Sequence, residues 1–318
     1  MTIQSPFNNH STALDVVQGH DLSGKTALVT GGSSGIGIET ARALAQADAE
    51  VILTARDIAK GEVVAQELRA STGNHKIHVL ELDLASLASI KSAAETFSQH
   101  WDKLHILINN AAVMATPLSY TPDGFEMQFG TNHLGHFALA NYLLPALLAS
   151  APSRVVAVSS IGHRRSDIVW EDIQYRTRPY DKFEAYSQSK TANILFAVGF
   201  NQHYANQGVT ANALNPGGAT TNLQKHLSRA EWLERGYIDA DGNLNPLFKS
   251  VEQGASTSVW AAVANELEGI GGLYLENCQE AGIWSDETQT GYMPYARSPE
   301  NAKRLWTLSE ELVGLSSS

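Results

Sequence analysis

Short apolar runs alternate with longer segments of helical periodicity along most of the chain, and this alternation restricts the fold more than any other feature. After the first run, apolar or small side chains between Ile36 and Ala47 recur at the spacing of one helix face. Runs that are apolar throughout and separated by helices are typical of a parallel sheet covered on both sides. The sequence therefore predicts an α/β fold with a doubly wound parallel sheet of the Rossmann type. The expected strands are residues 26–30, 50–54, 77–81, 106–109, 154–159 and 209–214.

The predicted sheet belongs to one domain. Residues 21–318 contain no linker and no change in composition, so we expect a single catalytic domain after a loose N-terminal extension of residues 1–20. Residues 217–250 break the alternation and are rich in Asn, Gly and Thr. Long excursions of this kind often form lids or binding loops, so we expect a substrate loop, with a plain surface insertion as the alternative. Trp232 and Phe248 either line a substrate pocket or anchor this loop.

Composition and short motifs disfavour nucleic acid as a partner, disulfides, membrane segments and a metal site. The formal net charge of −11 disfavours nucleic acid, because phosphate binding needs clustered Lys and Arg. The single cysteine, Cys278, cannot form an internal disulfide. The first residues lack the pattern of a signal peptide, and no apolar run is long enough for a membrane anchor, so we expect a cytoplasmic protein. His133 and His136 stand three apart without further ligands, and we expect no metal site.

A glycine-rich turn lies between the first expected strand and the first expected helix, with the sequence TGGSSGIG at residues 30–37. Glycine lets the backbone turn sharply and approach a phosphate, and the start of the following helix offers unpaired N–H groups to an anion. The GxxxxGK[ST] pattern of ATP-binding loops is absent from the sequence. The turn therefore predicts a dinucleotide site. The expected contacts are Gly31, Ser33, Ser34, Gly35, Ile36 and Gly37.

The end of the second expected strand bears on which dinucleotide binds. An acid at this place usually takes the ribose hydroxyls of NAD, whereas a nearby Arg suits the 2′-phosphate of NADP. Here the strand ends in the neutral Ala55, followed by Arg56 and Asp57. Asp57 could pair with Arg56 or cap the next helix. We expect NADP, with Arg56 at the 2′-phosphate and NAD as the alternative.

Tyr186 and Lys190 stand four residues apart in a segment of helical pattern, which places both on one helix face. A nearby cation favours phenolate over phenol, so we predict that Lys190, aided by a bound cationic nicotinamide, lowers the pKa of Tyr186 and that Tyr186 acts as general acid and base. A chance pair on a helix surface is the alternative. Ser160 ends the expected strand 154–159, at the edge where open α/β sheets bind ligands, and could hydrogen-bond a substrate oxygen.

Together these motifs resemble the short-chain dehydrogenase/reductase family, from about residue 22 to the C-terminus. The matching motifs arrive in the family's order as TGGSSGIG (30–37), LDL (82–84), NNAA (109–112), VSS (158–160), YSQSK (186–190) and NPGG (215–218). Four further stretches are similar to the retinol-dehydrogenase-like branch. These are TNHLGHF (131–137), SKTANILF (189–196), GLYLENC (272–278) and RLWTLSEELVG (304–314).

The resemblance implies roles for individual residues. Ser160 matches the catalytic serine, and Asn132 matches the helix asparagine that holds a water between Lys190 and solvent. Lys190 would also hold the nicotinamide ribose. The resemblance further implies a homodimer or homotetramer formed through the helices that contain Asn132 and Tyr186. The remaining implied cofactor contacts are Asp83 and Leu84 at adenine, Asn110 and Ala111 at the adenosine ribose, and Pro216, Gly217, Ala219 and Thr221 near the nicotinamide and its phosphates.

Two departures from the family pattern stand out. Ala112 occupies a position that is usually glycine, and the interval between Ser160 and Tyr186 is longer than in compact members. The retinol-dehydrogenase-like branch has a similar insertion, so the interval does not argue against activity.

The sequence thus predicts an NADP(H)-dependent oxidoreductase that interconverts a secondary alcohol and a ketone or aldehyde. The aromatic loop and the branch favour a small hydrophobic alcohol or ketone. One alternative is a non-catalytic NADP(H)-binding sensor or scaffold, although such a protein could lose Ser160, Tyr186 or Lys190. Another is an epimerase or dehydratase on the same fold. That alternative is disfavoured because three residues separate Gly31 from Gly35, whereas those enzymes usually carry TGxxGxxG.

Overall fold

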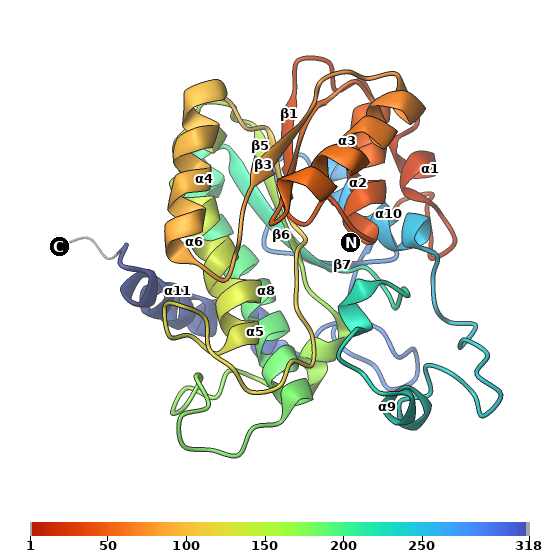
Figure 1. The fold of residues 1–318 in the computed structure, drawn as a ribbon, viewed down its shortest axis with the longest axis vertical. Helices are drawn as coiled ribbons and strands as arrows, with labels where there is room; N and C mark the ends of the chain where they lie inside the picture. Colours follow the sequence, from red (N-terminus) through yellow and green to blue (C-terminus); the bar gives the residue numbers. More distant parts are fainter. Residues whose placement is uncertain (1, 316–318) are drawn as a thin grey trace.

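A single eight-stranded sheet runs through the molecule in this computed structural model, which describes residues 2–315 (Figure 1). The strand order is β3-β2-β1-β4-β5-β6-β7-β8, and every neighbouring pair is parallel except β7 and β8. The doubly wound Rossmann-type fold predicted from the sequence is confirmed. The strands are β1 (Thr26–Val29), β2 (Glu50–Ala55), β3 (Ile77–Glu81), β4 (Ile106–Asn109), β5 (Ser153–Val158), β6 (Val209–Asn215), β7 (Tyr274–Glu276) and β8 (Gln279–Glu280).

Helices cover both faces of the sheet and form two separate hydrophobic cores. On one face lie α1 (Ala13–Val17), α2 (Ile36–Gln46), α3 (Ile58–Thr72) and α10 (Val251–Val263). On the other lie α4 (Leu87–His100), α6 (Gly135–Tyr142), α7 (Leu144–Leu148), α8 (Lys182–Tyr204) and α11 (Pro299–Val313). Two short helices, α5 (Met127–Phe129) and α9 (Arg229–Glu234), and a π-helical turn at Gly130–Leu134 complete the framework.

The chain reverses its direction of progress across the sheet beside β1. Leu28 of β1 pairs with Ile52 of β2 on one side and with Leu107 of β4 on the other. Strands added after β1 first extend the sheet one way and then, from β4 on, the opposite way. Such a reversal leaves a crevice beyond the carboxyl ends of the strands, where open α/β sheets bind their ligands.

The six strands predicted from the sequence match β1 to β6 closely, whereas β7 and β8 were not predicted. These two strands have three and two residues, too few for a periodic pattern. The expectation of a loose N-terminal extension is wrong for residues 2–20; Met1 lies outside the described residues. Val16 and Val17 of α1 are buried in the core beside α10.

Three imidazoles are buried inside the fold and are therefore uncharged. Burial lowers the pKa of His133 to about 3 and the pKa values of His136 and His163 to about 4. Between the ordinary value of 6.5 and these values, the unfolded chain binds protons that the folded chain does not. These histidines therefore cost the fold nothing above pH 6.5 but destabilise it progressively as the pH falls from there toward 4.

We predict that the free energy of unfolding decreases as the pH falls below 6.5, by about 1.4 kcal/mol per pH unit for each buried imidazole. Urea titrations at a series of pH values measure the slope. His133→Gln should make it shallower, whereas Gln at the exposed His75 should not. Burial raises the pKa values of Glu126 and Glu276, which act with the opposite sign, so the comparison of variants isolates the imidazoles. An identical slope in the His133 variant would contradict the prediction.

Candidate active site

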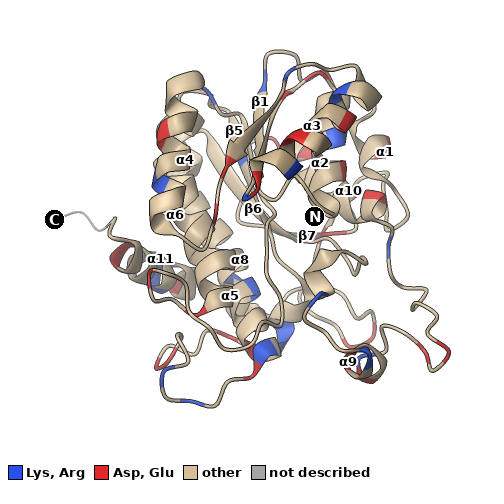
Figure 2. Cartoon of the chain, viewed as in Figure 1, with Lys and Arg blue, Asp and Glu red and all other residues tan. Residues whose placement is uncertain are grey.

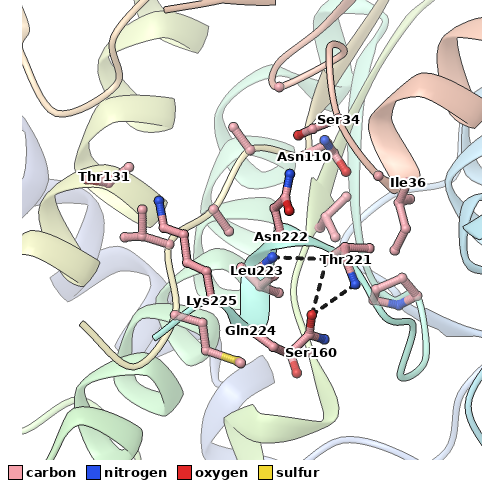
Figure 3. Close-up of a pocket in the computed structure, with 18 of the residues that line it drawn as sticks. Ser34, Ile36, Asn110, Thr131, Ser160, Thr221, Asn222, Leu223, Gln224 and Lys225 are labelled. Carbon is pink, nitrogen blue, oxygen red and sulfur yellow. Dashed lines mark hydrogen bonds between the residues drawn. The ribbon is translucent and has the colours of Figure 1, made fainter. Parts of the chain in front are cut away.

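A cavity of about 870 Å³ opens at the carboxyl ends of the parallel strands (Figure 3). It collects residues from the loops that follow the six strands β1 to β6, as the chain reversal beside β1 leads one to expect. Two residues of the predicted site, Gly37 and Asn132, do not line it. The predicted residues that do are Gly31, Ser33, Ser34, Gly35, Ile36, Arg56, Asp83, Leu84, Asn110, Ala111, Ser160, Tyr186, Lys190, Pro216, Gly217, Ala219 and Thr221.

The glycine-rich turn forms one end of this cavity. Gly31 and Gly35 have φ values of 63° and 53°, in the left-handed region that other residues rarely adopt. No side chain caps the start of α2 at Gly35, which leaves the helix start open to an anion. The hydroxyl of Thr30 fixes the base of the turn, because it accepts hydrogen bonds from the N–H groups of Asn110 (2.8 Å) and Ala111 (3.0 Å).

Gly37 lies behind this turn, where the first helix meets the strand. A Cβ at this position would lie 2.3 Å from the carbonyl oxygen of Gly31 and 2.8 Å from Nδ2 of Asn110. Gly37 therefore permits the close contact between helix and turn without facing the cavity.

The end of β2 supplies cations to the same cavity. Ala55 is neutral, and Arg56 lines the cavity together with Lys60, which was not among the predicted site residues. Asp57 accepts a hydrogen bond from the N–H of Lys60 (3.2 Å) and so caps α3, and its carboxylate lies 3.5 Å from Nζ of Lys60. Of the two roles considered for Asp57, the structure therefore has the helix cap. No ion pair joins Arg56 to a carboxylate within residues 2–315.

Tyr186, Lys190 and Ser160 meet at the other end of the cavity. Tyr186 and Lys190 lie one turn apart on α8, with Nζ of Lys190 5.6 Å from the centre of the Tyr186 ring. Lys190 is 1% exposed and donates a hydrogen bond to the carbonyl of Val158 at 3.0 Å. The hydroxyl of Ser160 accepts the N–H of Gly162 at 3.0 Å and begins the turn after β5.

Burial dominates the electrostatics of this group. It lowers the pKa of Lys190 to about 7, because an ammonium with a single carbonyl partner is poorly solvated. Burial likewise raises the pKa of Tyr186 above its ordinary value, and a hydrogen bond with Ser160 opposes this only in part. The sequence predicted the opposite direction for Tyr186. The four-residue spacing on the helix places the ammonium near the phenol. It does not reveal how far both groups are removed from water, and this desolvation decides the direction of the pKa shift.

The side chain of Asn132 hydrogen-bonds to the backbone of a neighbouring loop. Its Oδ1 accepts the N–H of Val113 and its Nδ2 donates to the carbonyl of the same residue, both at 2.9 Å. Its main-chain carbonyl, in the π-helical turn, lies 2.9 Å from Nδ1 of His136 in α6. Nε2 of His136 lies 2.8 Å from the hydroxyl of Thr30. The amide of Asn132 therefore holds the loop that borders the cavity, and its link to a water stays a prediction.

Apolar side chains surround Tyr186, and sequence reasoning missed most of them. Tyr186 packs in a small cluster with Met114 and Ala115, against which Phe183, Leu223 and Leu227 lie. Tyr237 and Phe248, from the segment 217–250, also line the cavity. Trp232 does not line it but packs on both, with ring centres 5.7 Å and 6.4 Å away. The sequence signal that could have identified this apolar lining is the presence of apolar residues within the otherwise polar segment 217–250.

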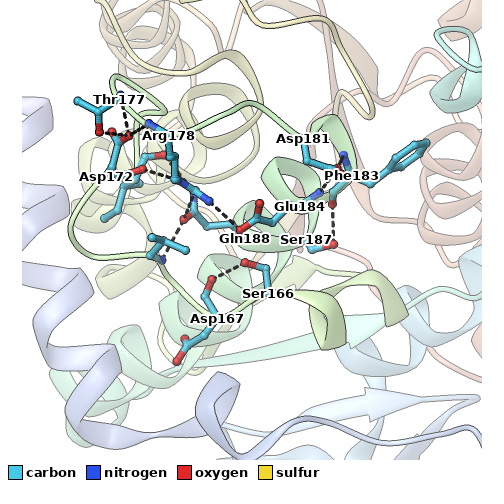
Figure 4. Close-up of polar contacts among 12 residues, drawn as sticks. Ser166, Asp167, Asp172, Thr177, Arg178, Asp181, Phe183, Glu184, Ser187 and Gln188 are labelled. Atoms are coloured by element: carbon cyan, nitrogen blue, oxygen red, sulfur yellow. Dashed lines mark hydrogen bonds and ion pairs between the residues drawn. The ribbon is translucent and has the colours of Figure 1, made fainter.

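The long interval between Ser160 and Tyr186 forms a belt held by polar contacts (Figure 4). The carboxylate of Asp172 accepts the N–H of Thr177 (2.8 Å) and the N–H of Arg178 (2.9 Å). Arg178 then bridges to Glu184 (2.7 Å) and Gln188 (3.2 Å) of α8. The belt thus fastens to the helix that carries Tyr186, and none of these five residues lines the cavity.

Comparison with known proteins identifies the family. The model of short chain dehydrogenases matches residues 25–232. Mouse retinol dehydrogenase 13 is 43% identical over 298 residues, which span 92% of this chain and 85% of the relative. The chain belongs to the short-chain dehydrogenase/reductase family. It is a retinol-dehydrogenase-like member and an oxidoreductase that acts on CH–OH groups, and its family binds NAD(P).

Solved structures agree with this assignment. An uncharacterized protein from Mycobacterium paratuberculosis superposes with a TM-score of 0.73 at 33% identity, covering 96% of this chain and 98% of that one. The NADP complex of Pseudomonas aeruginosa RhlG superposes with a TM-score of 0.62 at 25% identity, covering 80% and 95%. Within residues 2–315, none of the helices combines the length and apolar character needed to cross a bilayer.

We predict that Gly37→Ala weakens dinucleotide binding and lowers stability, because the new methyl group displaces the Gly31 carbonyl and the Asn110 amide. Overpacking of this kind costs about 1–3 kcal/mol. Urea unfolding and fluorescence titration with NADPH measure the two effects. Gly282→Ala is the matched control, because a Cβ there meets nothing within 4 Å. Equal stability and affinity in the two variants would refute the role given to Gly37.

Proposed function

We propose that this short-chain dehydrogenase/reductase uses NADP(H) to interconvert a small hydrophobic alcohol and the corresponding carbonyl compound, a ketone from a secondary alcohol or an aldehyde from a primary one. One observation carries the proposal. The cavity that begins at the open helix start of α2 ends at the buried pair Tyr186 and Lys190, so one continuous space joins a phosphate cradle to a proton donor. The dinucleotide, when bound, supplies the hydride through its nicotinamide ring.

Tyr186 is suited to give a proton to a carbonyl oxygen. Because burial raises its pKa, the phenol is protonated near neutral pH and available as a general acid. This state fits the direction of ketone reduction. The Ser160 hydroxyl, next to the phenol, holds the same substrate oxygen in place. Lys190, with a pKa of about 7, becomes charged readily and stabilises the phenolate that remains after proton transfer.

The preference for NADP rests on residues 55–60, which follow β2 and begin α3. An anionic 2′-phosphate placed there meets the neutral Ala55 and the cations Arg56 and Lys60. The carboxylate of Asp57 is engaged by the α3 cap and by Lys60. Arg can contact a phosphate through two parallel N–H groups. The RhlG relative named above was crystallised with NADP.

The substrate class follows from the apolar lining beside Tyr186. The cavity there is lined by Met114, Leu223, Tyr237 and Phe248. A site of this composition favours an apolar molecule with one carbonyl or hydroxyl group. Retinol dehydrogenase 13, a relative of this chain, is named for an alcohol of that kind. Residues 217–250 then serve as the substrate loop.

We predict that Tyr186→Phe lowers the rate of ketone reduction by about 10²–10⁴-fold, because the general acid is lost. NADPH affinity should change little, since only one hydroxyl is removed. NADPH consumption across a panel of hydrophobic ketones measures the rate, and fluorescence titration measures the affinity. Tyr142→Phe removes a phenol outside the cavity and should be silent. Full activity in Tyr186→Phe would disprove the mechanism. A wild-type chain that binds NADPH but reduces no ketone would indicate a non-catalytic binding protein.

We predict that Arg56→Ala weakens NADPH binding by roughly 10–100-fold, because hydrogen bonds to a charged group contribute about 1.5–3 kcal/mol. NADH lacks the 2′-phosphate, so its affinity should stay the same. Arg304→Ala, an exposed arginine on α11, controls for the change in overall charge. Titration of each variant with both dinucleotides gives the result. Equal weakening for NADPH and NADH would place the 2′-phosphate elsewhere.

A further inference from the structure

We propose that His163 and Glu276 are positioning residues that fix the peptide group directly after Ser160. They hold its two ends through one ring of hydrogen bonds, which Asn215 and the segment 291–293 complete. Neither His163 nor Glu276 lines the cavity, so both act through other residues rather than on a substrate or dinucleotide. The inference rests on the proposed function, because it assigns them to the serine side of that site.

The imidazole of His163 holds the carbonyl end of this peptide group. The N–H of Met293 lies 3.2 Å from Nε2 of His163, and because a backbone N–H can only donate, Nε2 carries the lone pair. Nδ1 therefore carries the proton and donates it to the carbonyl oxygen of Ser160 at 2.7 Å. Burial lowers the pKa of His163 to about 4, so the ring stays neutral and keeps these two opposite roles.

Glu276 is an acid buried at the end of β7. Figure 2 shows how sparse charged residues are on the sheet, where β1, β4 and β6 carry none. Glu276 is 9% exposed; one carboxylate oxygen accepts Nδ2 of Asn215 at 2.6 Å and the other accepts the N–H of Gly291 at 3.0 Å. Burial raises its pKa, whereas these two hydrogen bonds and the charge of Lys249 act against the rise. With a donor at each oxygen, a carboxylate, which only accepts, fits this place.

Asn215 passes the effect of Glu276 to the N–H end of the peptide group. Because Nδ2 of Asn215 donates to the carboxylate, its Oδ1 faces the other way and accepts the N–H of Ile161 at 3.2 Å and the N–H of Gly217 at 3.1 Å. A reversed amide would set its NH₂ group against both of these donors. The acid on β7 thus selects the amide orientation that supports the residue after Ser160 and the glycine loop after β6.

The carbonyl of Ser160 and the N–H of Ile161 are the two polar ends of one peptide group. A peptide group is planar, so holding both ends fixes its rotation relative to the Cα atom of the serine. The turn that follows packs directly on the phenol, since a Cβ at Gly162 would lie 3.3 Å from both Oγ of Ser160 and Cε1 of Tyr186. A rotated peptide group would therefore change the position of the serine hydroxyl relative to the phenol.

All of these contacts belong to one closed ring. It runs from Ser160 through His163 to Met293, along the backbone to Gly291, and through Glu276 and Asn215 back to Ile161. The loops after β5 and β6, the end of β7 and the segment beyond β8 meet in it. A buried polar network holds one geometry only when every member is satisfied, so the loss of one side chain loosens the whole ring.

The first test removes the contact to the carbonyl. His163→Phe keeps a ring beside Tyr274, whose ring centre lies 5.1 Å away, but lacks both nitrogens. We expect kcat for ketone reduction to fall by about 10–100-fold, because a misplacement of about 1 Å can cost roughly 10²-fold. NADPH affinity should be unchanged. Val17→Ala, buried in the core on the opposite face, should lower stability but not kcat. Unchanged kcat in folded His163→Phe would overturn the proposal.

The second test acts at the N–H end. In Glu276→Gln one of the two donors meets an NH₂ group, so kcat should again fall by about 10–100-fold. NADPH affinity should here also weaken, by about 2–10-fold, because Gly217 loses the support of Asn215. Glu280→Gln is the matched control; its carboxylate accepts the N–H of Ile3 at 2.9 Å, which an amide oxygen can also do. Equal kcat and affinity in these two variants would overturn the proposal.

The third test needs neither substrate nor dinucleotide. The ¹⁵N NMR spectrum of the histidine side chains of the wild-type chain at pH 7 should contain a neutral Nδ1–H imidazole that is lost in His163→Phe. A protonated ring or the Nε2–H form at His163 would overturn the proposal. A wild-type chain that reduces no ketone would contradict the proposed function itself. An active chain with the wrong form of His163, or with active variants, would contradict only the positioning role.

Discussion

The burial of one ammonium group determines much of this structure. Lys190 is almost fully removed from water and donates a hydrogen bond to the Val158 carbonyl, an arrangement that costs free energy because one acceptor replaces only part of the hydration of an ammonium. The same burial changes both partners of the central pair, because it makes Lys190 easier to deprotonate and Tyr186 harder to ionise. A phenol that stays protonated beside an amine that titrates near neutrality suits the proton transfer proposed above, whereas two solvated groups at the same spacing would differ little from their ordinary states.

That burial depends on parts of the chain far from the cavity. Helix α8 can hold Lys190 away from water only because α6, the sheet and α11 enclose it. The aromatic contacts of Trp306 and the bond from Ser309 to His133 lie more than 100 residues beyond the residues they support, in chain order. Stability of the outer helices and electrostatics of the site are therefore linked, since loosening the cover admits water to the groups whose pKa values depend on its absence.

The sequence predicted the parts that local patterns encode. Strands β1 to β6 are largely apolar runs, the glycine turn and Ser160 directly follow strands, and Tyr186 and Lys190 stand four residues apart, so the first two were expected at the sheet edge where ligands bind. Strands β7 and β8 are too short to show the alternation of a strand in their sequence. Helix α1 has only five residues, too few for a helical pattern that would predict its packing on α10. The direction of the Tyr186 shift was wrong for a related reason. A pair of residues on a helix reveals proximity, but desolvation is a property of everything packed around them, most of which is distant in sequence.

Asp57 shows how a local hydrogen bond can settle what composition leaves open. An acid one residue beyond Arg56 could have neutralised that guanidinium or taken a ribose hydroxyl, and either would favour a different dinucleotide. In the fold its backbone is extended and its carboxylate turns toward the N–H of Lys60, because the first turn of α3 needs a cap. Asp57 lines the cavity wall beside Arg56 and Lys60, but its carboxylate caps α3 and lies against Lys60. The charge at the end of β2 therefore depends on the cap of α3 as well as on the residues of the strand.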